Sequence, residues 1–550
     1  MMDASKYKVG YFPVSKEYNK WVEKDHIEKA PIWCSVDMRD GNQSLVIPMS
    51  LEEKLEYYKV LLQVGFKEIE VGFPAASETE YEFLRTLIDN NMIPEDVTVQ
   101  VLTQCREHII RKTFDACKGA PSAIIHFYNS VSVAQREQVF KKSKEEIKKI
   151  AVDGAKLVKK LAAEYEGNFR FEYSPESFTG TEPEYALEVC NAVLDVLEPS
   201  ETNNVIINLP VTVEMSMPHV YASQVEYMSE NLKYREFVTL SLHPHNDRGT
   251  GVASAELAVM AGADRVEGCL FGNGERTGNV CLVTLAMNLY SQGISPNLDF
   301  SDMNRVVETV ETCNQLPVHP RHPWAGRLAY TAFSGSHQDA IKKGFDARKP
   351  GERWEMPYLP VDPQDIGCTY EAVIRVNSQS GKSGSAWLIE QNHGLKLPRA
   401  LQQDFSQHVQ QETDNHGKEM TQNALWQLFR ARYGLVASPP LALQSYRSDS
   451  QQDGQLRLTA SVATQGGTRQ LEGQGNGLLS AAAHGLSRWI NASFVIKDYH
   501  EHTLGERSDS RSVAYIRCLF QDGTSRWGVG IDSDVARASI QALFNAVSRS

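Results

Sequence analysis

The sequence lacks several features that would assign it at once to a particular class of proteins. No apolar run in its 550 residues approaches the ~20 that a helix needs to cross a bilayer, so no membrane partner is expected. The nine cysteines are scattered without a CxxC pair, which is typical of reduced thiols in a cytoplasmic protein. The N-terminal region has no apolar core, so a secretory signal is not expected either.

Positive charge is also scarce. The chain carries 56 Lys and Arg against 69 Asp and Glu, a formal net charge of -13, whereas a nucleic-acid-binding protein needs a basic face. Nucleic acid is therefore not expected as a general partner, although a local basic patch for one phosphorylated ligand fits this balance. The hydrophobic fraction of 41% is ordinary for a soluble globular chain, and the length allows two or three domains.

Strand-like and helix-like segments alternate from residue 32 to about 292. The strand candidates are near-continuous apolar runs, such as Val205-Ile-Ile, as expected for a parallel sheet buried on both faces. Eight β/α units over about 260 residues match the size of a (β/α)8 TIM barrel, which is the predicted fold. The predicted strands are 32–38, 66–72, 97–103, 123–128, 169–174, 204–209, 237–242 and 264–270. The predicted helices are 51–64, 79–91, 106–117, 134–164, 183–197, 218–233, 250–261 and 280–292.

The region after the barrel is less regular. It contains helical pieces at 302–314, 337–343 and 419–433, an irregular Pro-rich stretch at 354–363 and a Gly/Ser-rich loop at 378–385. These features indicate a connecting region, followed by a polar linker. The predicted domains are an N-terminal extension (1–30), the barrel (31–300), the connecting region (301–436), the linker (437–454) and a C-terminal domain (455–550).

The C-terminal domain shows an internal repeat. Two segments that begin with Gly-Thr, at 467 and 523, each lead to a Gly-rich turn and then to a helix, at 478–490 and 534–547. The pattern predicts an α+β domain of two ββα halves. Such a domain could bind a small effector where its halves or two subunits meet, or it could serve only to dimerise the chain.

Polar residues gather at the C-terminal ends of the predicted barrel strands, where barrel enzymes carry their chemistry. His243 and His245 lie two apart at the end of the seventh strand, so both imidazoles face the same side. Asp40 follows the first strand, and only a closed barrel brings it beside this pair. Three such ligands leave positions open for substrate and water, which predicts a catalytic divalent metal, Mg2+, Mn2+ or Zn2+. The alternative is a histidine pair that only caps the strand.

Each neighbouring polar residue has two interpretations. Arg39 could neutralise an oxyanion beside the metal, or form a structural ion pair with Glu176 or Glu70. Glu176 could orient or protonate groups at the reacting centre, or only bond to loops. The 272–279 loop could hold phosphate, or its glycines could simply allow tight turns, and Asn279 could be a further metal ligand.

Three motifs carry a resemblance to a known family. They are Arg39-Asp-Gly-Asn-Gln, His243-Pro-His-Asn-Asp-Arg-Gly and Gly272-Asn-Gly-Glu-Arg-Thr-Gly-Asn. Together they resemble the signatures of the 2-isopropylmalate synthases, one of a wider group of metal-dependent barrel enzymes, and the resemblance spans nearly the whole chain. Ser174-Pro-Glu-Ser-Phe-Thr-Gly-Thr and Asn208-Leu-Pro-Val-Thr favour the long form of that family.

The resemblance implies a Claisen-type condensation of acetyl-CoA with 2-oxoisovalerate, then thioester hydrolysis to 2-isopropylmalate and CoA. It implies a divalent metal, with Mg2+ the first choice, that chelates the keto acid. The implied metal ligands are Asp40, His243, His245 and Asn279.

The resemblance also implies roles for residues around the metal. Arg39 would stabilise the alkoxide, and Glu176 would help to position the reacting groups. His337 and Tyr370 would complete the site from the partner subunit of a homodimer. The implied keto-acid pocket consists of His126, Ser174, Asn208, Pro210 and Thr212.

The C-terminal domain is similar to the leucine-sensing domain of the same family. This similarity implies feedback inhibition by leucine, with the effector bound near Gly475, Asn476 and Gly477 and the 498–502 stretch.

Three other functions are compatible with parts of the sequence. A sister synthase would use pyruvate or 2-oxoglutarate and give citramalate or homocitrate, but a dicarboxylate acceptor would need an extra cation in the pocket. An acyl-CoA carbon–carbon lyase would share the metal site, although such lyases generally lack the C-terminal repeat. A catalytically silent amino-acid sensor would need only the repeat, and the intact Arg39, Asp40 and histidine pair argue against it.

Overall fold

The computed structural model describes residues 2–368, 382–416, 420–452, 454–505 and 510–548. The chain divides into two compact units. The first consists of Met1–Ala329 with Gln364–Cys368, and the second of Tyr330–Pro363 with Thr369–Ser550. None of the described helices is both long and apolar enough to cross a membrane.

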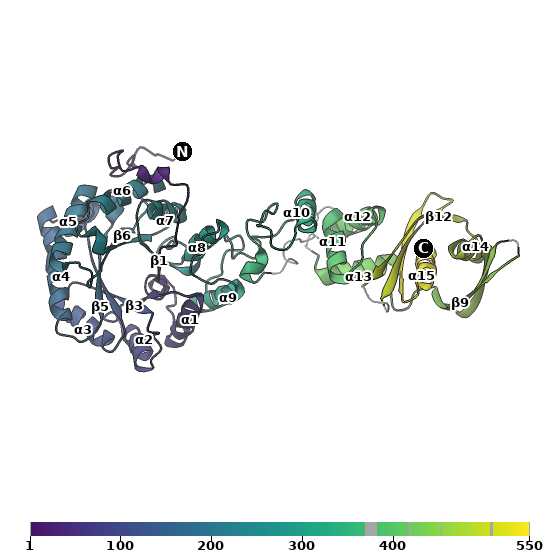
Figure 1. The fold of residues 1–550 in the computed structure, drawn as a ribbon, viewed down its shortest axis with the longest axis horizontal. Helices are drawn as coiled ribbons and strands as arrows, with labels where there is room; N and C mark the ends of the chain where they lie inside the picture. Colours follow the sequence, from purple (N-terminus) through teal and green to yellow (C-terminus); the bar gives the residue numbers. More distant parts are fainter. Residues whose placement is uncertain (1, 369–381, 417–419, 453, 506–509, 549–550) are drawn as a thin grey trace. The chain divides into compact units, whose positions relative to one another are not determined.

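The first unit contains a closed barrel of eight parallel strands in sequence order, which confirms the predicted fold. Closure comes from the pairing of the first strand with the last, with Cys34 opposite Glu267. Figure 1 looks into the barrel and shows the strands surrounded by helices. The strands are β1 (Ile32–Ser35), β2 (Glu68–Gly72), β3 (Thr98–Thr103), β4 (Ala123–Ser130), β5 (Phe169–Glu176), β6 (Val205–Val211), β7 (Val238–Pro244) and β8 (Arg265–Gly268).

The barrel helices begin where the sequence supplies capping residues. Ser50 and Glu53 form a capping box at the start of α1, and Gly65 ends that helix with a φ of 106°. The helices are α1 (Leu51–Val64), α2 (Glu78–Asp89), α3 (Glu107–Cys117), α4 (Lys144–Ala162), α5 (Pro183–Leu197), α6 (Pro218–Asn231), α7 (Gly251–Met260) and α8 (Leu282–Ser291).

The predicted helix over 134–164 is wrong in its first third. A short π-helix, η3 (Gln135–Phe140), ends at Lys141, whose φ of 52° is left-handed. Helix α4 then starts afresh after Ser143, which forms a capping box with Glu146. The Ser-x-x-Glu signature at 143–146 is therefore a true helix start inside what reads as one long helical pattern.

The connecting region is mostly helical. A helix that the sequence analysis did not predict, α12, buries Leu401, Phe405 and Val409, which are spaced by four residues. Residues 382–385 of the predicted Gly/Ser-rich loop belong to α11 instead, and the rest of that loop lies outside the described residues. The helices are α9 (Met303–Asn314), α10 (Gly335–Ala347), α11 (Lys382–His393), α12 (Arg399–His416) and α13 (Gln422–Tyr433).

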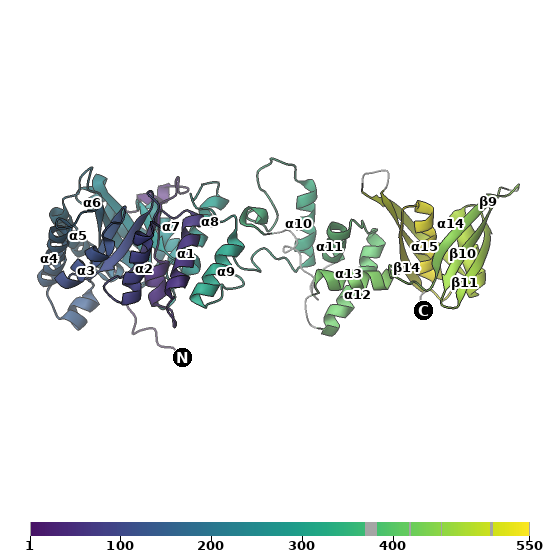
Figure 2. The ribbon, with the colours of Figure 1, turned by 90° about the horizontal axis from the view of Figure 1, so that it is seen from below.

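The C-terminal repeat is confirmed, with one more strand in each half than the sequence predicted. Each half is a three-stranded antiparallel sheet followed by a helix, and Figure 2 shows the two helices between the two sheets. The first half consists of β9 (Ala442–Ser450), β10 (Leu456–Thr464), β11 (Gly467–Gly475) and α14 (Leu478–Ile490). The second consists of β12 (Phe494–Leu504), β13 (Arg511–Phe520), β14 (Ser525–Asp532) and α15 (Val535–Val547).

Two sequence predictions are corrected in this domain. Half of the predicted linker at 437–454 forms β9, an edge strand whose side chains are largely exposed and therefore polar like those of a loop. Four of the five glycines predicted to form turns lie within strands, directly beneath the helices, and Gly477 is the N-cap of α14. The four are Gly473, Gly475, Gly528 and Gly530. A Cβ on Gly473 would lie 2.7 Å from the backbone nitrogen of Gly485, so glycine allows the helix to sit on the sheet.

Candidate metal and substrate site

Three metal-ligating side chains converge at the C-terminal end of the barrel strands. Asp40 lies in η2 (Asp37–Gly41), which follows β1, while His243 and His245 lie at the end of β7. Their ligand atoms all lie within 4.8 Å of one another, and all three side chains are buried. The carboxylate Oδ2 of Asp40 is 3.8 Å from His243 Nε2 and 3.9 Å from His245 Nε2.

Asn279 closes this group from the loop that follows β8. Its Nδ2 donates to Asp40 Oδ2 at 2.7 Å, and its Oδ1 lies 2.9 Å from His243 Nε2. The buried Nδ1 of His245 has no hydrogen-bond partner in the described part of the chain. One carboxylate, two imidazoles and an amide oxygen, all buried and convergent, fit a divalent cation.

The electrostatics of the group also suit a cation. Burial opposes ionisation of Asp40, but the charges of Arg39 and His243 outweigh it and hold the Asp40 pKa well below its usual range. Burial likewise opposes charge on His243, but Asp40 and Glu267 outweigh it and raise the His243 pKa to about 10. Burial and the charge on His243 lower the pKa of His245 to about 4. The group therefore stabilises one positive charge, the proton on His243, and a bound metal would take the place of that proton.

Arg39 is held between two carboxylates. Its Nη1 donates to Asp40 Oδ1 at 2.7 Å and its Nε donates to Glu70 Oε2 at 2.6 Å. Of the two ion-pair partners considered from the sequence, the structure brings Glu70 to Arg39. Glu176 instead accepts a hydrogen bond from Ser130 Oγ.

A cavity of about 220 Å³ opens beside these ligands, and all five predicted keto-acid residues line it. His126 Nε2 lies 2.7 Å from Ser174 Oγ, which also accepts a hydrogen bond from Asn208 Nδ2 at 3.0 Å. The lining residues are Arg39, Asp40, Gln43, Leu102, His126, Tyr128, Ser174, Glu176, Asn208, Pro210, Thr212, His243, His245, Glu275 and Arg276.

Several of these lining residues were not predicted. Tyr128 lies two residues after His126 on β4, so the alternation that revealed the histidine pair could also have revealed it. Leu102 lies among other apolar residues of β3, so only the direction of its side chain in the structure identifies it as a cavity residue. Glu275 and Arg276 lie in the 272–279 loop, where Gly272, with a φ of 77°, and Gly278, with a φ of 92°, make the tight turns considered from the sequence.

Comparisons with known proteins identify the family to which the chain is similar. A family described as HMGL-like matches residues 30–310, one described as "Alpha-isopropylmalate synthase, post-catalytic domain-like" matches 327–390, and one described as "LeuA allosteric (dimerisation) domain" matches 419–550. A 2-isopropylmalate synthase from Desulfitobacterium hafniense is 54% identical over 551 residues, covering 100% of this chain and 98% of that one. One from Helicobacter hepaticus is 52% identical, covering 100% of both chains.

The chain belongs to the 2-isopropylmalate synthase family. Among solved structures, a hydroxymethylglutaryl-CoA lyase from Pseudomonas aeruginosa matches with 17% identity and a TM-score of 0.42, covering 52% of this chain and 92% of that one.

The remaining residues that the family resemblance implied lie outside the barrel. His337 lies on α10 of the second unit, where its ring stacks on Tyr358 with centroids 4.0 Å apart. Tyr370 lies outside the described residues. Asn476 and Gly477, at the start of α14, line a cavity of about 480 Å³ in the C-terminal domain, whereas Gly475, at the end of β11, does not.

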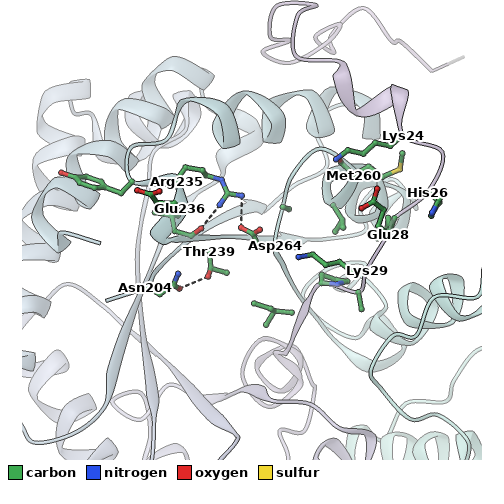
Figure 3. Close-up of a pocket in the computed structure, with 18 residues that line it drawn as sticks. Lys24, His26, Glu28, Lys29, Asn204, Arg235, Glu236, Thr239, Met260 and Asp264 are labelled. Carbon is green, nitrogen blue, oxygen red and sulfur yellow. Dashed lines mark hydrogen bonds and ion pairs between the residues drawn. The ribbon is translucent and has the colours of Figure 1, made fainter. Parts of the chain in front are cut away.

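A larger cavity, of about 1000 Å³, lies at the opposite end of the barrel, where β1, β6, β7 and β8 begin (Figure 3). Three of its charged groups have partners: Arg235 Nη2 lies 2.9 Å from Asp264 Oδ2, and Lys24 Nζ donates to the carbonyl oxygen of Met260 at 2.6 Å. Within the described ranges, no group of three metal-ligating side chains converges in it. The smaller cavity, with its convergent ligands, is therefore the candidate site for the family's chemistry.

Proposed function

We propose that the chain is a 2-isopropylmalate synthase, which condenses acetyl-CoA with 2-oxoisovalerate and hydrolyses the thioester to give 2-isopropylmalate and CoA. The observation that carries this proposal is the convergence of the buried side chains of Asp40, His243 and His245, beside Arg39, at one cavity. The full-length similarity to proteins named 2-isopropylmalate synthase supports the choice of reaction.

Asp40, His243 and His245 would hold the metal, with Asn279 as a further oxygen ligand. The metal, Mg2+ by preference and Mn2+ or Zn2+ as alternatives, would supply polarisation of the keto-acid carbonyl. Asp40 and Asn279 would both bind through oxygen, the ligand atom that Mg2+ and Mn2+ prefer, and this supports either of these two metals.

Arg39 is the candidate for neutralising the alkoxide that forms as the new carbon–carbon bond closes. Its guanidinium is buried, so its charge acts with little screening by water. Glu70 and Asp40 fix its orientation before substrate arrives, which avoids reorganisation during the reaction. Glu176, at the end of β5, is proposed to position the reacting groups.

The cavity also supports a small acceptor. Its volume of about 220 Å³ suits a branched keto acid rather than an entire acyl-CoA, and Leu102 and Pro210 offer apolar surface to an isopropyl group. Polar atoms of His126, Ser174 and Asn208 lie on the same wall and could orient the acceptor. Arg276 lines the cavity too, but Asp247 neutralises it, with Nε to Oδ1 at 2.7 Å, which disfavours a dicarboxylate.

Leucine is the proposed effector, bound in the 480 Å³ cavity of the C-terminal domain. The N-terminal residues of both α14 and α15 line this cavity. Asp534 caps the start of α15, whereas no side chain caps the start of α14, so the N–H groups of α14 suit a carboxylate. Glu501 offers a charge partner for an ammonium group, while Leu478 and Val535 offer apolar contact to an isobutyl group. We also propose that the chain forms a homodimer in which His337 and Tyr370 of each subunit complete the site of the other. The proposed location of this homodimer is the cytoplasm.

The test is thiol release from acetyl-CoA by the purified chain with Mg2+ or Mn2+. The acceptors are 2-oxoisovalerate, pyruvate, 2-oxoglutarate and glyoxylate, each with and without leucine and with EDTA. A preference for 2-oxoisovalerate that is lost with EDTA and reduced by leucine supports both proposals, whereas preference for another acceptor indicates a sister synthase. His243→Ala should abolish thiol release, and His219→Ala, which removes an exposed histidine of α6, should not. Absence of thiol release with every acceptor would overturn the synthase proposal.

A further inference from the structure

A network of charged side chains crosses the interior of the barrel, where apolar side chains usually fill the space. At its centre is Arg265 of β8, which is fully buried. Its guanidinium donates to Ser241 Oγ at 2.9 Å and to Gln100 Oε1 at 2.6 Å. It also contacts the carboxylates of Glu68, Glu172 and Glu267, so its donors are fully used. A buried network of this kind is costly unless each charge is paired, and burial raises the pKa of Glu172 well above its usual range, so that this carboxyl holds its proton.

The network reaches the metal site through Glu267. This residue is fully buried, two residues after Arg265 on the same strand, so both side chains face the barrel interior. Its Oε1 contacts the Arg265 guanidinium, while its Oε2 lies 2.8 Å from Nδ1 of His243. Glu267 therefore joins a fixed cation on one side to a proposed metal ligand on the other.

We propose that Glu267 is the positioning residue of the metal site. It accepts the Nδ1 hydrogen of His243, which fixes the ring's tautomer and orientation and leaves Nε2 facing Asp40. Arg265 holds the carboxylate in place and balances its charge. The inference rests on the proposed metal site, since Glu267 acts only through His243.

His243 and His245 differ in whether Nδ1 has a hydrogen-bond partner, which is the contact through which Glu267 would act. His243 Nδ1 has Glu267, whereas the buried Nδ1 of His245 has no partner among the described residues. His245 can therefore rotate without breaking a hydrogen bond at Nδ1, and His243 is the imidazole whose direction the barrel dictates. A second imidazole in the cavity is anchored in the same way, since His126 Nδ1 lies 3.0 Å from Glu70 Oε1.

The test uses the full-length chain and Mn2+ as the probe, with the dissociation constant measured by electron paramagnetic resonance. Glu267→Gln keeps the shape of the side chain and removes its charge. Glu172→Gln is the matched control, because Glu172 contacts Arg265 at 3.3 Å but not His243. We expect Glu267→Gln to raise the Mn2+ dissociation constant by about 10- to 100-fold. The control should change it by less than about threefold, since a glutamine resembles the protonated form of a carboxyl that burial holds at a raised pKa.

Kinetics give a second measurement. Glu267 is proposed to act on His243 and not on the substrate. Saturating Mn2+ should therefore recover most of the turnover lost in Glu267→Gln, while the Mn2+ concentration that gives half activity rises. If Glu267→Gln does not fold, Glu267→Asp carries the same test, because it keeps the charge and withdraws it by one methylene group.

Two outcomes would refute the positioning role of Glu267 alone, and a third would also refute the proposed metal site. Wild-type Mn2+ affinity in Glu267→Gln, with affinity lost in His243→Ala, would show that the carboxylate does not position the ligand. Equal losses in Glu267→Gln and Glu172→Gln would show that the whole network, rather than this contact, determines affinity. Unchanged affinity in His243→Ala would refute the proposed metal site itself.

Discussion

Replacement of Gly530 by alanine should loosen the C-terminal domain by separating α15 from its sheet. Gly530 lies on β14, and a Cβ there would lie 2.7 Å from the backbone nitrogen of Ala542 and closer still to the carbonyl oxygen of Ala538. Ordinary contacts begin at 3.4 Å. The helix must therefore withdraw by at least about 0.7 Å, since neither obstacle is a flexible side chain. The φ of Gly530 is not left-handed, so the effect is steric alone.

The magnitude follows from how tightly α15 is packed. The helix buries Ile540, Leu543 and Phe544 against the sheets, and overpacking in such a core costs about 1–3 kcal/mol. Amide hydrogen exchange should then accelerate in β13, β14 and α15 by about 5- to 150-fold, with the barrel amides unchanged. Exchange followed by mass spectrometry resolves these segments in the full-length chain.

The matched control is Gly466→Ala, in the turn between β10 and β11. The nearest atom to its Cβ would be Thr464 Oγ1 at 3.9 Å, so the change should shift stability by less than about 0.5 kcal/mol. Because α15 also lines the proposed effector cavity, Gly530→Ala should weaken inhibition by leucine and leave thiol release without leucine intact. Equal exchange rates in the two variants would refute the reasoning that the helix lies directly on glycine.

Two further predictions concern the first unit. Burial raises the pKa of Asp37 to about 6, so its contribution to stability is fully present below about pH 4 and is lost as pH rises through about 6. In urea titrations the free energy of unfolding of the wild type should therefore fall by about 2 kcal/mol relative to Asp37→Asn between pH 4 and pH 7, and parallel profiles would contradict this assignment. Arg39→Lys keeps the charge but cannot bond to both Asp40 and Glu70, so the kcat for thiol release should fall by about 100-fold or more with an unchanged circular dichroism spectrum. A loss below about fivefold would argue against a role for Arg39 in the transition state.

The barrel and its site could be predicted from the sequence because two patterns agree. Parallel strands buried on both faces appear as short apolar runs, and the polar residues that end them must meet once the sheet closes. This logic placed Asp40 beside His243 although they come from β1 and β7. It also found His126 and Ser174, which follow the same rule on β4 and β5.

What the sequence did not reveal are the residues whose role depends on direction rather than type. Arg265 and Glu267 lie two apart on β8, so alternation puts them on one face, but no spacing rule shows that this face is the barrel interior or that the two side chains pair. The sequence of β9 predicts a linker because an exposed edge strand needs few apolar residues. Tyr128 was missed for a different reason, since the alternation that would have revealed it was applied only to the histidines.

The distance along the chain between the proposed metal-site residues would link ion binding to folding. Asp40 and Asn279 are hydrogen-bonded although 239 residues separate them. Closing a loop of that length costs about 5 kcal/mol of chain entropy beyond a constant, so the unfolded chain scarcely ever assembles the site. During synthesis the ligand from β1 must wait until β8 has left the ribosome and paired with it. An ion that binds only the closed barrel stabilises it by about 2.7 kcal/mol at a concentration 100 times its dissociation constant. Opening the seam between β1 and β8 and releasing such an ion would then be one event, and the ion would hold the whole barrel closed.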